Sequence, residues 1–202
     1  DPGTGLIVIK PSGVRYSEMT EQDMVVVDDN GTVIEGRRRP STDTSTHLAL
    51  YRGALRAGAV VHTHSTWATA WAQAHRPIPV LGTTHADMSP YDVPVTAPLS
   101  PEEVQGDYEI ATGVAILAAV SGRPAQDVPA VLVDGHGPFC WGADPAGAVA
   151  AAITLEAIAK MAWATVVLAP EVSSLAGHLI DRHHSRKHGP GAYYGQGDGH
   201  QG

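Results

Sequence analysis

The chain has 202 residues, of which 43% are hydrophobic and 17% charged, a composition typical of one folded globular domain with a sizeable core. Its formal net charge of -8 argues against a surface for nucleic acid or anionic membrane, where a basic face is expected. The single cysteine, Cys140, excludes an internal disulfide and fits a reducing compartment, so a cytoplasmic protein is expected.

The first part of the chain predicts antiparallel strands. A short apolar run covers residues 6–9, and two further runs cover residues 24–27 and 32–35. The sequence Asp-Asn-Gly at 29–31 is a strong turn signal, so the second and third runs predict a hairpin.

The rest of the chain alternates predicted helices with predicted strands. One helix is predicted to begin at residues 41–44, and others are predicted to cover residues 66–74, 106–120 and 173–187. A long Ala-rich helix is predicted to open at Asp144-Pro145, with Asp as N-cap and Pro at the first helical position. The strands cover residues 59–61, 130–133 and 139–141, with short strands around Val80 and Val95. The region 146–168 is as apolar as a membrane span, but Glu156 and Lys160 lie inside it at helical spacing, so a buried helix is expected. The pattern predicts an α/β fold with helices on both faces of a mixed sheet.

Three histidines form a candidate metal site. His62 and His64 lie two residues apart in an extended segment, so both side chains point to the same side. His136 follows a second buried strand and would reach the same edge of a shared sheet. Three neutral imidazoles leave one coordination position open, which is typical of a catalytic zinc site. The alternative is a chance spacing in a chain with 11 histidines.

The turn before the first helix offers a candidate anion site. Asp43 is a fourth acidic candidate for the metal site, although an N-cap carboxylate is expected there anyway. The hydroxyls of Ser41 and Thr42 and the unpaired amides of the turn suit a phosphate. A second loop would hold the phosphate from the other side, through Lys10, Ser12 and Gly13. Taken alone, the second loop is typical of an ordinary surface turn.

Short motifs follow one another in a specific order from about residue 6 to residue 196. They read VIKPSGV at 8–14, MVVV at 24–27, STDT at 41–44, VHTHS at 61–65, GTTHAD at 82–87, GDYE at 106–109, HGPF at 136–139, RKHG at 186–189 and AYYGQ at 192–196. In this order the motifs resemble those of the class II aldolase superfamily and, within it, of the L-ribulose-5-phosphate 4-epimerases.

The resemblance implies a three-layer α/β/α sandwich around a mixed, largely antiparallel central sheet. It implies a single domain over residues 1–196 and a homotetramer with active sites at subunit interfaces. The Gly-rich residues 197–202 lie beyond the motifs and are expected to form a flexible tail. The cofactor would be Zn²⁺ or another divalent metal such as Mn²⁺ or Co²⁺, and neither a nucleic acid nor a membrane is expected as a partner. The family also has a leading helix and strand with a Gly-Asn-x-Ser phosphate loop, and nothing before Leu6 matches that segment.

The resemblance also assigns residues to roles. The metal ligands would be His62, His64, His136 and Asp43, and the phosphate contacts would be Lys10, Ser12, Gly13, Ser41 and Thr42. Asp107 and Tyr194 match the acid/base pair, and His183 matches a further active-site histidine. The implied reaction interconverts L-ribulose 5-phosphate and D-xylulose 5-phosphate by retro-aldol cleavage and re-formation of a carbon–carbon bond.

Several alternatives stay open. The chain could be a class II sugar-phosphate aldolase of the fuculose-phosphate type, although sugar aldolases of the superfamily tend to carry Glu at the position of Asp43. It could also be a non-catalytic, adducin-like interaction domain, which would have no reason to keep three converging histidines. Asp107 could be the N-cap of the following helix, and Tyr194 could be a packed aromatic residue.

Overall fold

The computed structural model describes residues 3–53, 55, 57–188 and 192–193. Its helices are α1 (Thr44–Arg52), α2 (Thr66–Gln73), α3 (Thr83–Met88), α4 (Pro101–Gln105), α5 (Tyr108–Ala119), α6 (Pro145–Leu168) and α7 (Gly177–His188), with a short 3-10 turn at Glu21–Asp23. Its strands are β1 (Ile7–Ile9), β2 (Val25–Val27), β3 (Val33–Glu35), β4 (Ala59–His62), β5 (Ala130–Val133) and β6 (Gly137–Gly142).

The named strands form two antiparallel sheets. One sheet has the order β1-β2-β3, and the other has the order β4-β6-β5. The predicted hairpin is confirmed: β2 pairs antiparallel with β3 across a turn in which Asp28 Oδ1 accepts hydrogen bonds from the amides of Asn30 and Thr32. The mixed character of the fold comes from a parallel bridge between Val95, which lies outside the named strands, and Leu132 of β5.

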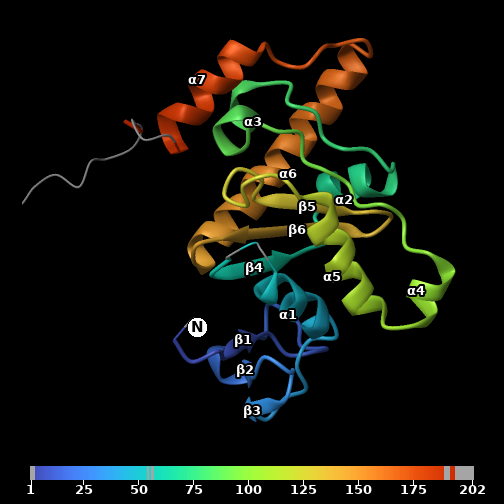
Figure 1. Ribbon diagram of the computed structural model, residues 1–202, viewed down its shortest axis with the longest axis vertical. Coiled ribbons are helices and arrows are strands. Elements are labelled where there is room, and N and C mark those ends of the chain that lie inside the picture. Colours follow the sequence, from blue (N-terminus) through green and yellow to red (C-terminus); the bar gives the residue numbers. More distant parts are fainter. Residues whose placement is uncertain (1–2, 54, 56, 189–191, 194–202) are drawn as a thin grey trace, which may run out of the picture.

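Helices cover both faces of the β4-β6-β5 sheet (Figure 1). Neighbouring residues of β5 point to opposite faces, so Leu132 packs in a core with α2 and α6, whereas Val131 packs in a second core with α1 and α5. Leu155 of α6 and Leu50 of α1 are fully buried in these two cores. The predicted α/β fold class, with helices on either side of an antiparallel sheet, is confirmed.

Helix α6 packs on the sheet with one face, while Ile153, Trp163 and Leu168 among its apolar residues are exposed. The expected buried helix is therefore buried along one face only. It lies against β4, β6 and α2, and its residues Leu155, Ile158 and Ala159 are buried. Among the described helices, it is the one whose length and composition would allow it to cross a membrane, which for a single helix is weak evidence. The N-terminus of α6 is as predicted, because Asp144 accepts a hydrogen bond from the amide of Gly147 as N-cap.

The segment 76–101 differs from the prediction. Val95 forms an isolated bridge with Leu132, and Val80 lies two residues after Ile78, which forms another, so neither valine lies in a strand. The two short helices α3 and α4 were not predicted. Each of these helices has at most six residues, too short for a periodic apolar pattern. The last helix begins at Gly177 rather than at residue 173, because the amide of Leu175 donates a hydrogen bond to the carbonyl of Val80.

Candidate metal centre

Three histidines meet where β4 ends and β6 begins. The two strands are antiparallel, with His62 opposite Phe139, so the segment after β4 lies beside the segment before β6. The ring centroids of His62 and His64 lie 5.1 Å apart. The ring centroid of His136 lies 4.9 Å from each of the other two. One ligand nitrogen from each ring lies within 4.8 Å of the others, so this cluster could bind a metal ion.

Strand β6 fixes the ring of His62. Its Nδ1 lies 3.0 Å from the carbonyl oxygen of Pro138, and its face stacks on Phe139 with ring centroids 4.1 Å apart. A carbonyl oxygen only accepts hydrogen bonds, so Nδ1 carries the ring proton and Nε2 keeps its lone pair. His62 therefore offers Nε2 to a cation, as metal-binding histidines with a carbonyl partner do.

Burial favours the neutral form of two of these imidazoles, those of His62 and His136. Burial lowers the pKa of His62 from 6.5 to about 4, against the raising effects of the Pro138 hydrogen bond and the Asp43 carboxylate. Burial also lowers the pKa of His136, and the proximity of His64 lowers it further. Metal ions bind the neutral form of histidine, so the lowered pKa values of His62 and His136 fit a divalent cation of the zinc type.

Gly137 allows the two ligand segments to approach each other. A Cβ atom at this position would lie 2.8 Å from the carbonyl oxygen of Thr63 and 3.3 Å from Cδ2 of His64. The first distance is shorter than carbon and oxygen atoms tolerate without a backbone shift, so only glycine fits here. The carbonyl oxygen of Thr63, between His62 and His64, occupies the space that a side chain at position 137 would need.

Asp43 lies at the N-terminus of α1, beside the histidine cluster. Its side chain makes no cap hydrogen bond to α1, and its Oδ2 lies 3.4 Å from Oγ of Ser41. The carboxylate raises the pKa of His62 and of His136, after the larger effects of burial and of the neighbouring groups, so its charge acts on the cluster. No side-chain hydrogen bond therefore supports the alternative that Asp43 is a helix cap. Asp43 is also not one of the three residues whose ligand atoms form the cluster.

The two loops expected to hold phosphate are joined by backbone hydrogen bonds. The amide of Ser41 donates to the carbonyl of Lys10 at 2.9 Å, and the amide of Ser12 donates to the carbonyl of Arg39 at 2.9 Å. Gly13 has φ +72, in the left-handed region that favours glycine. Thr42 is exposed and Ser41 is buried. The structure thus brings the predicted phosphate segments together.

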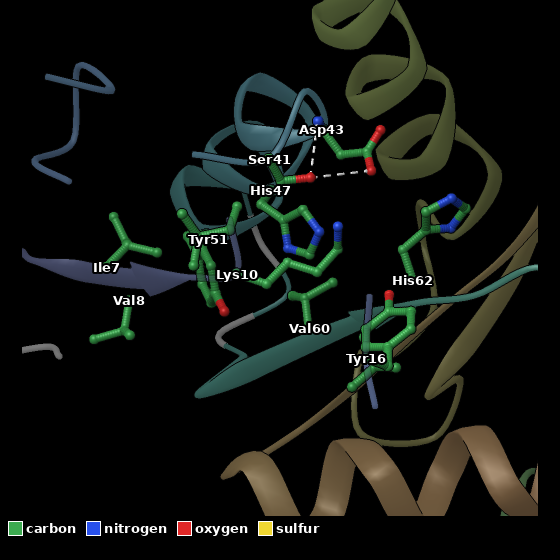
Figure 2. Close-up of a pocket in the computed structure, with 12 residues that line it drawn as sticks. Ile7, Val8, Lys10, Tyr16, Ser41, Asp43, His47, Tyr51, Val60 and His62 are labelled. Atoms are coloured by element: carbon green, nitrogen blue, oxygen red, sulfur yellow. Dashed lines mark hydrogen bonds between the residues drawn. The ribbon is translucent and has the colours of Figure 1, made fainter. Parts of the chain in front are cut away.

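A cavity of about 210 Å³ lies beside these loops (Figure 2). Asp43, His47 and His62 are among the residues that line it (Figure 2). Its full lining is Ile7, Val8, Ile9, Lys10, Tyr16, Ser41, Asp43, His47, Tyr51, Val60, Val61 and His62. Lys10 and Ser41 from the predicted phosphate set therefore share one hollow with His62 from the predicted metal set.

The motif at 106–109 contributes to the cluster through a residue that was not predicted. Asp107 is the N-cap of α5, where its Oδ1 accepts a hydrogen bond from the amide of Ile110 at 3.1 Å. The structure thus gives Asp107 the capping bond of the alternative interpretation. The next residue, Tyr108, has its hydroxyl 3.1 Å from Nδ1 of His136.

His183 has contacts away from the three clustered histidines. It lies on α7, and its Nδ1 is 3.0 Å from Oδ1 of Asp87 on α3. The guanidinium of Arg186 also donates to both oxygens of Asp87, at 3.0 and 2.7 Å. Burial raises the pKa of Asp87, but the hydrogen bonds from Arg186 and His183 outweigh it and leave the pKa below its usual value. Tyr194 lies outside the described residues.

Sequence reasoning gave no role to Tyr108, Asp87 or His47, which are now connected to predicted site residues. The first two belong to the motifs at 106–109 and 82–87, and their partners lie 28 and 96 residues away in the chain. Burial lowers the pKa of His47 to about 4, and this residue lines the cavity. For Tyr108 and Asp87, motif membership was the only signal in the sequence that could have drawn attention to them.

The chain is similar to known proteins over most of its length. Residues 1–163 match the family described as Class II Aldolase and Adducin N-terminal domain. An L-fuculose 1-phosphate aldolase is 27% identical and superimposes with a TM-score of 0.76, covering 92% of this chain and 82% of that one. YgbL from Klebsiella pneumoniae, a candidate aldolase/epimerase/decarboxylase, is 27% identical with a TM-score of 0.69, covering 88% and 81%. The L-fuculose-1-phosphate aldolase of Thermus thermophilus is 25% identical with a TM-score of 0.60, covering 82% and 81%.

Proposed function

The chain belongs to the class II aldolase and adducin family, and on that premise we propose that it is a metal-dependent enzyme that breaks and forms a carbon–carbon bond in a phosphorylated keto-sugar. The observation that carries this proposal is the convergence of three imidazoles from two strand ends. An adducin-like interaction module would gain nothing from such a cluster, so this alternative has less support.

The chain's own residues divide into a metal end and a phosphate end. His62, His64 and His136 would hold the metal, with the carboxylate of Asp43 beside them. A bound divalent cation, Zn²⁺ or another such as Mn²⁺ or Co²⁺, would supply the positive charge that stabilises the anion left when the sugar's carbon–carbon bond breaks. The phosphate end contains the cationic Lys10 and the hydroxyl-bearing loops.

The cavity supports this division. Lys10 supplies an ammonium group and Ser41 a hydroxyl to the same cavity that His62 lines. A phosphate is recognised by such a cation together with hydrogen-bond donors. Ser12, Gly13 and Thr42 lie on the same two joined loops and are proposed to contact the phosphate through the backbone or hydroxyl groups. A small phosphorylated sugar would thus have its phosphate at the loops and its keto end at the histidines.

Within this chemistry, the finer proposal is an L-ribulose-5-phosphate 4-epimerase. The order of the motifs supports it, as does Asp rather than Glu at position 43. The second candidate is an aldolase of the fuculose-phosphate type, which the similarity to L-fuculose 1-phosphate aldolases favours. Both reactions cleave the same kind of bond. In the epimerase the aldehyde stays bound and is attacked on its other face, whereas in the aldolase it leaves.

The acid/base groups complete the proposal. One group must take a proton from the carbon-four hydroxyl, and another must return it on the opposite side. Asp107 and Tyr194 are the proposed pair, with His183 as a further active-site group. Asp87 is a further candidate for the acid/base role, because its carboxylate is hydrogen-bonded to His183. Tyr194→Phe should keep the metal and the fold but sharply reduce turnover, and wild-type turnover would exclude Tyr194 as an acid or base.

Assembly as a homotetramer, with active sites shared between subunits, is also proposed. Helix α6 exposes apolar side chains that another protein surface could cover, namely Val149, Ile153, Met161, Trp163, Val167 and Leu168. His183 is bound to α3 rather than to the histidine cluster, so a neighbouring subunit could present it to a site. Light scattering coupled to gel filtration measures the assembly. A monomer at working concentration would contradict this part of the proposal.

Product analysis tests the function directly. The protein is loaded with Zn²⁺ and incubated separately with L-ribulose 5-phosphate and L-fuculose 1-phosphate. An epimerase yields D-xylulose 5-phosphate without accumulation of dihydroxyacetone, whereas an aldolase releases dihydroxyacetone phosphate and an aldehyde from the second substrate. Chelator-treated protein and His136→Asn serve as controls and should be inactive. If neither substrate is converted by metal-loaded protein, both candidates are wrong.

A further inference from the structure

Tyr108 lies against the histidine cluster from the side of α5. It is the first residue of this helix, and its side chain is half-buried. Its hydroxyl is 3.1 Å from Nδ1 of His136, and the two ring centroids lie 6.3 Å apart. Tyr108 is thus the side chain that contacts the ring nitrogen of a candidate metal ligand.

The backbone around Tyr108 is fixed by neighbours on both sides. Before it, Asp107 accepts the hydrogen bond from Ile110 that begins α5. After it, the carbonyl of Glu109 accepts a hydrogen bond at 2.7 Å from the hydroxyl of Thr46, a buried residue of α1. Asp43, also beside the cluster, precedes the same helix α1. The first turn of α5 is therefore held in place without any contribution from the Tyr108 hydroxyl.

The chemistry of a histidine ligand gives this contact a function. A ring that binds a metal through one nitrogen carries its proton on the other, and that N–H needs an acceptor. For His62 the acceptor is the carbonyl of Pro138, at 3.0 Å from Nδ1. For His136 the group at the corresponding Nδ1 is the hydroxyl of Tyr108, which can accept this proton.

We propose that Tyr108 is a positioning residue for the metal centre: its hydroxyl accepts the Nδ1 proton of His136 and selects the tautomer in which Nε2 is free for the cation. The inference rests on the proposed metal site. Tyr108 does not itself bind the metal. It fixes the ring orientation of one ligand, in the way that the Pro138 carbonyl fixes His62. Because a side chain supplies this contact, a substitution can remove it, which is not true of the backbone contact to His62.

The test is Tyr108→Phe, which deletes one oxygen and keeps the ring. Zn²⁺ affinity is measured by competition with a chromogenic chelator, and we expect it to fall by roughly 10-fold to 100-fold. Tyr91→Phe is the matched control, because Tyr91 makes its hydrogen bonds with His85 and Ser89 through its backbone, and it should bind Zn²⁺ like the wild type.

The outcomes separate this inference from the proposed function. If wild-type protein binds Zn²⁺ and Tyr108→Phe binds it equally well, the positioning role is wrong and the metal site stands. If wild-type protein binds no Zn²⁺, both fail. A second measurement does not depend on the variant folding: nitrogen-15 NMR of metal-free wild-type protein should find the proton of His136 on Nδ1. A proton on Nε2 would overturn the inference.

Discussion

The carboxylate of Glu156, near the middle of α6, accepts a hydrogen bond from the backbone amide of Trp67 at 2.8 Å, in the first turn of α2. Its other oxygen accepts from the amide of Ala68 at 3.0 Å. A negative charge at a helix N-terminus satisfies unpaired amides and interacts favourably with the helix dipole. Because α2 begins two residues after His64, this contact also anchors the segment that carries the metal-binding pair.

Glu156→Ala should destabilise the protein by about 1–2 kcal/mol, because two amides of α2 lose their acceptor. Urea denaturation measures the free energy of unfolding, and chelator competition measures Zn²⁺ affinity, which should fall as well. Glu156→Gln should lose less, since its amide oxygen still accepts one bond. Glu171→Ala, in the exposed segment after α6, is the matched control. Equal stability of Glu156→Ala and the control would show that the cap contributes nothing.

Gly137→Ala should weaken metal binding without removing any ligand. The added methyl group would lie 2.8 Å from the carbonyl of Thr63, so the segment that carries His64 must shift. Overpacking of this kind costs about 1–3 kcal/mol. Gly82→Ala is the control, because its Cβ would meet no atom within 4 Å. Wild-type stability together with wild-type Zn²⁺ affinity in Gly137→Ala would contradict the claim that only glycine fits at this position.

The stability of metal-free protein should fall as the pH falls from about 6.5 to about 4. In the folded chain, burial lowers the pKa of His47 and of His62 to about 4, from an ordinary 6.5. Between these values the unfolded chain takes up protons that the buried rings do not, so acid favours unfolding. Each ring can contribute at most about 1.4 kcal/mol per pH unit.

Urea denaturation in the presence of a chelator, repeated at several pH values in this range, measures this slope. His47→Asn should make the slope shallower, because one of the rings whose pKa is lowered by burial is gone. His178→Asn, at an exposed position on α7, should leave it unchanged. A stability that does not vary with pH in this window would mean that these rings titrate alike in the folded and unfolded chain.

Substitutions of Asp107 distinguish a helix cap from an acid/base group. Asn caps a helix as well as Asp does, so Asp107→Asn should keep wild-type stability, whereas Asp107→Ala should lose about 1 kcal/mol. The proposed acid/base role predicts that both variants lose turnover while the bound metal stays. If Asp107→Asn turns over substrate like the wild type, Asp107 is only a cap. Asp87→Asn would then be the next carboxylate to test, because Asp87 holds His183.

The long elements of the fold could be predicted because their patterns are local. Asp144 followed by a proline predicted the start of α6, and the Asp-Asn-Gly turn predicted the hairpin of β2 and β3. The short helix α3 could not be predicted, because six residues give no periodic pattern. The start of α7 at Gly177 depends on the bond between Leu175 and Val80, which are far apart in the chain.

The candidate site also has a part that could be predicted from the sequence and a part that could not. His62 and His64 could be paired from their spacing alone, and His136 from its position after a buried strand, because strand geometry fixes where such residues point. The contacts of Tyr108 with His136 and of Asp87 with His183 depend on helices packed from elsewhere in the chain. The spacing of residues along the chain contains no signal for such contacts, so they required the structure.

Metal content measured by elemental analysis tests the central claim most directly. Wild-type protein, loaded with Zn²⁺ and then dialysed, should keep one ion per chain, and His64→Asn and His136→Asn should each lose it together with turnover. His178→Asn, on the exposed face of α7, should keep it. A wild-type protein without bound metal, or a His136→Asn variant that retains it, would contradict the claim that His62, His64 and His136 form a metal centre.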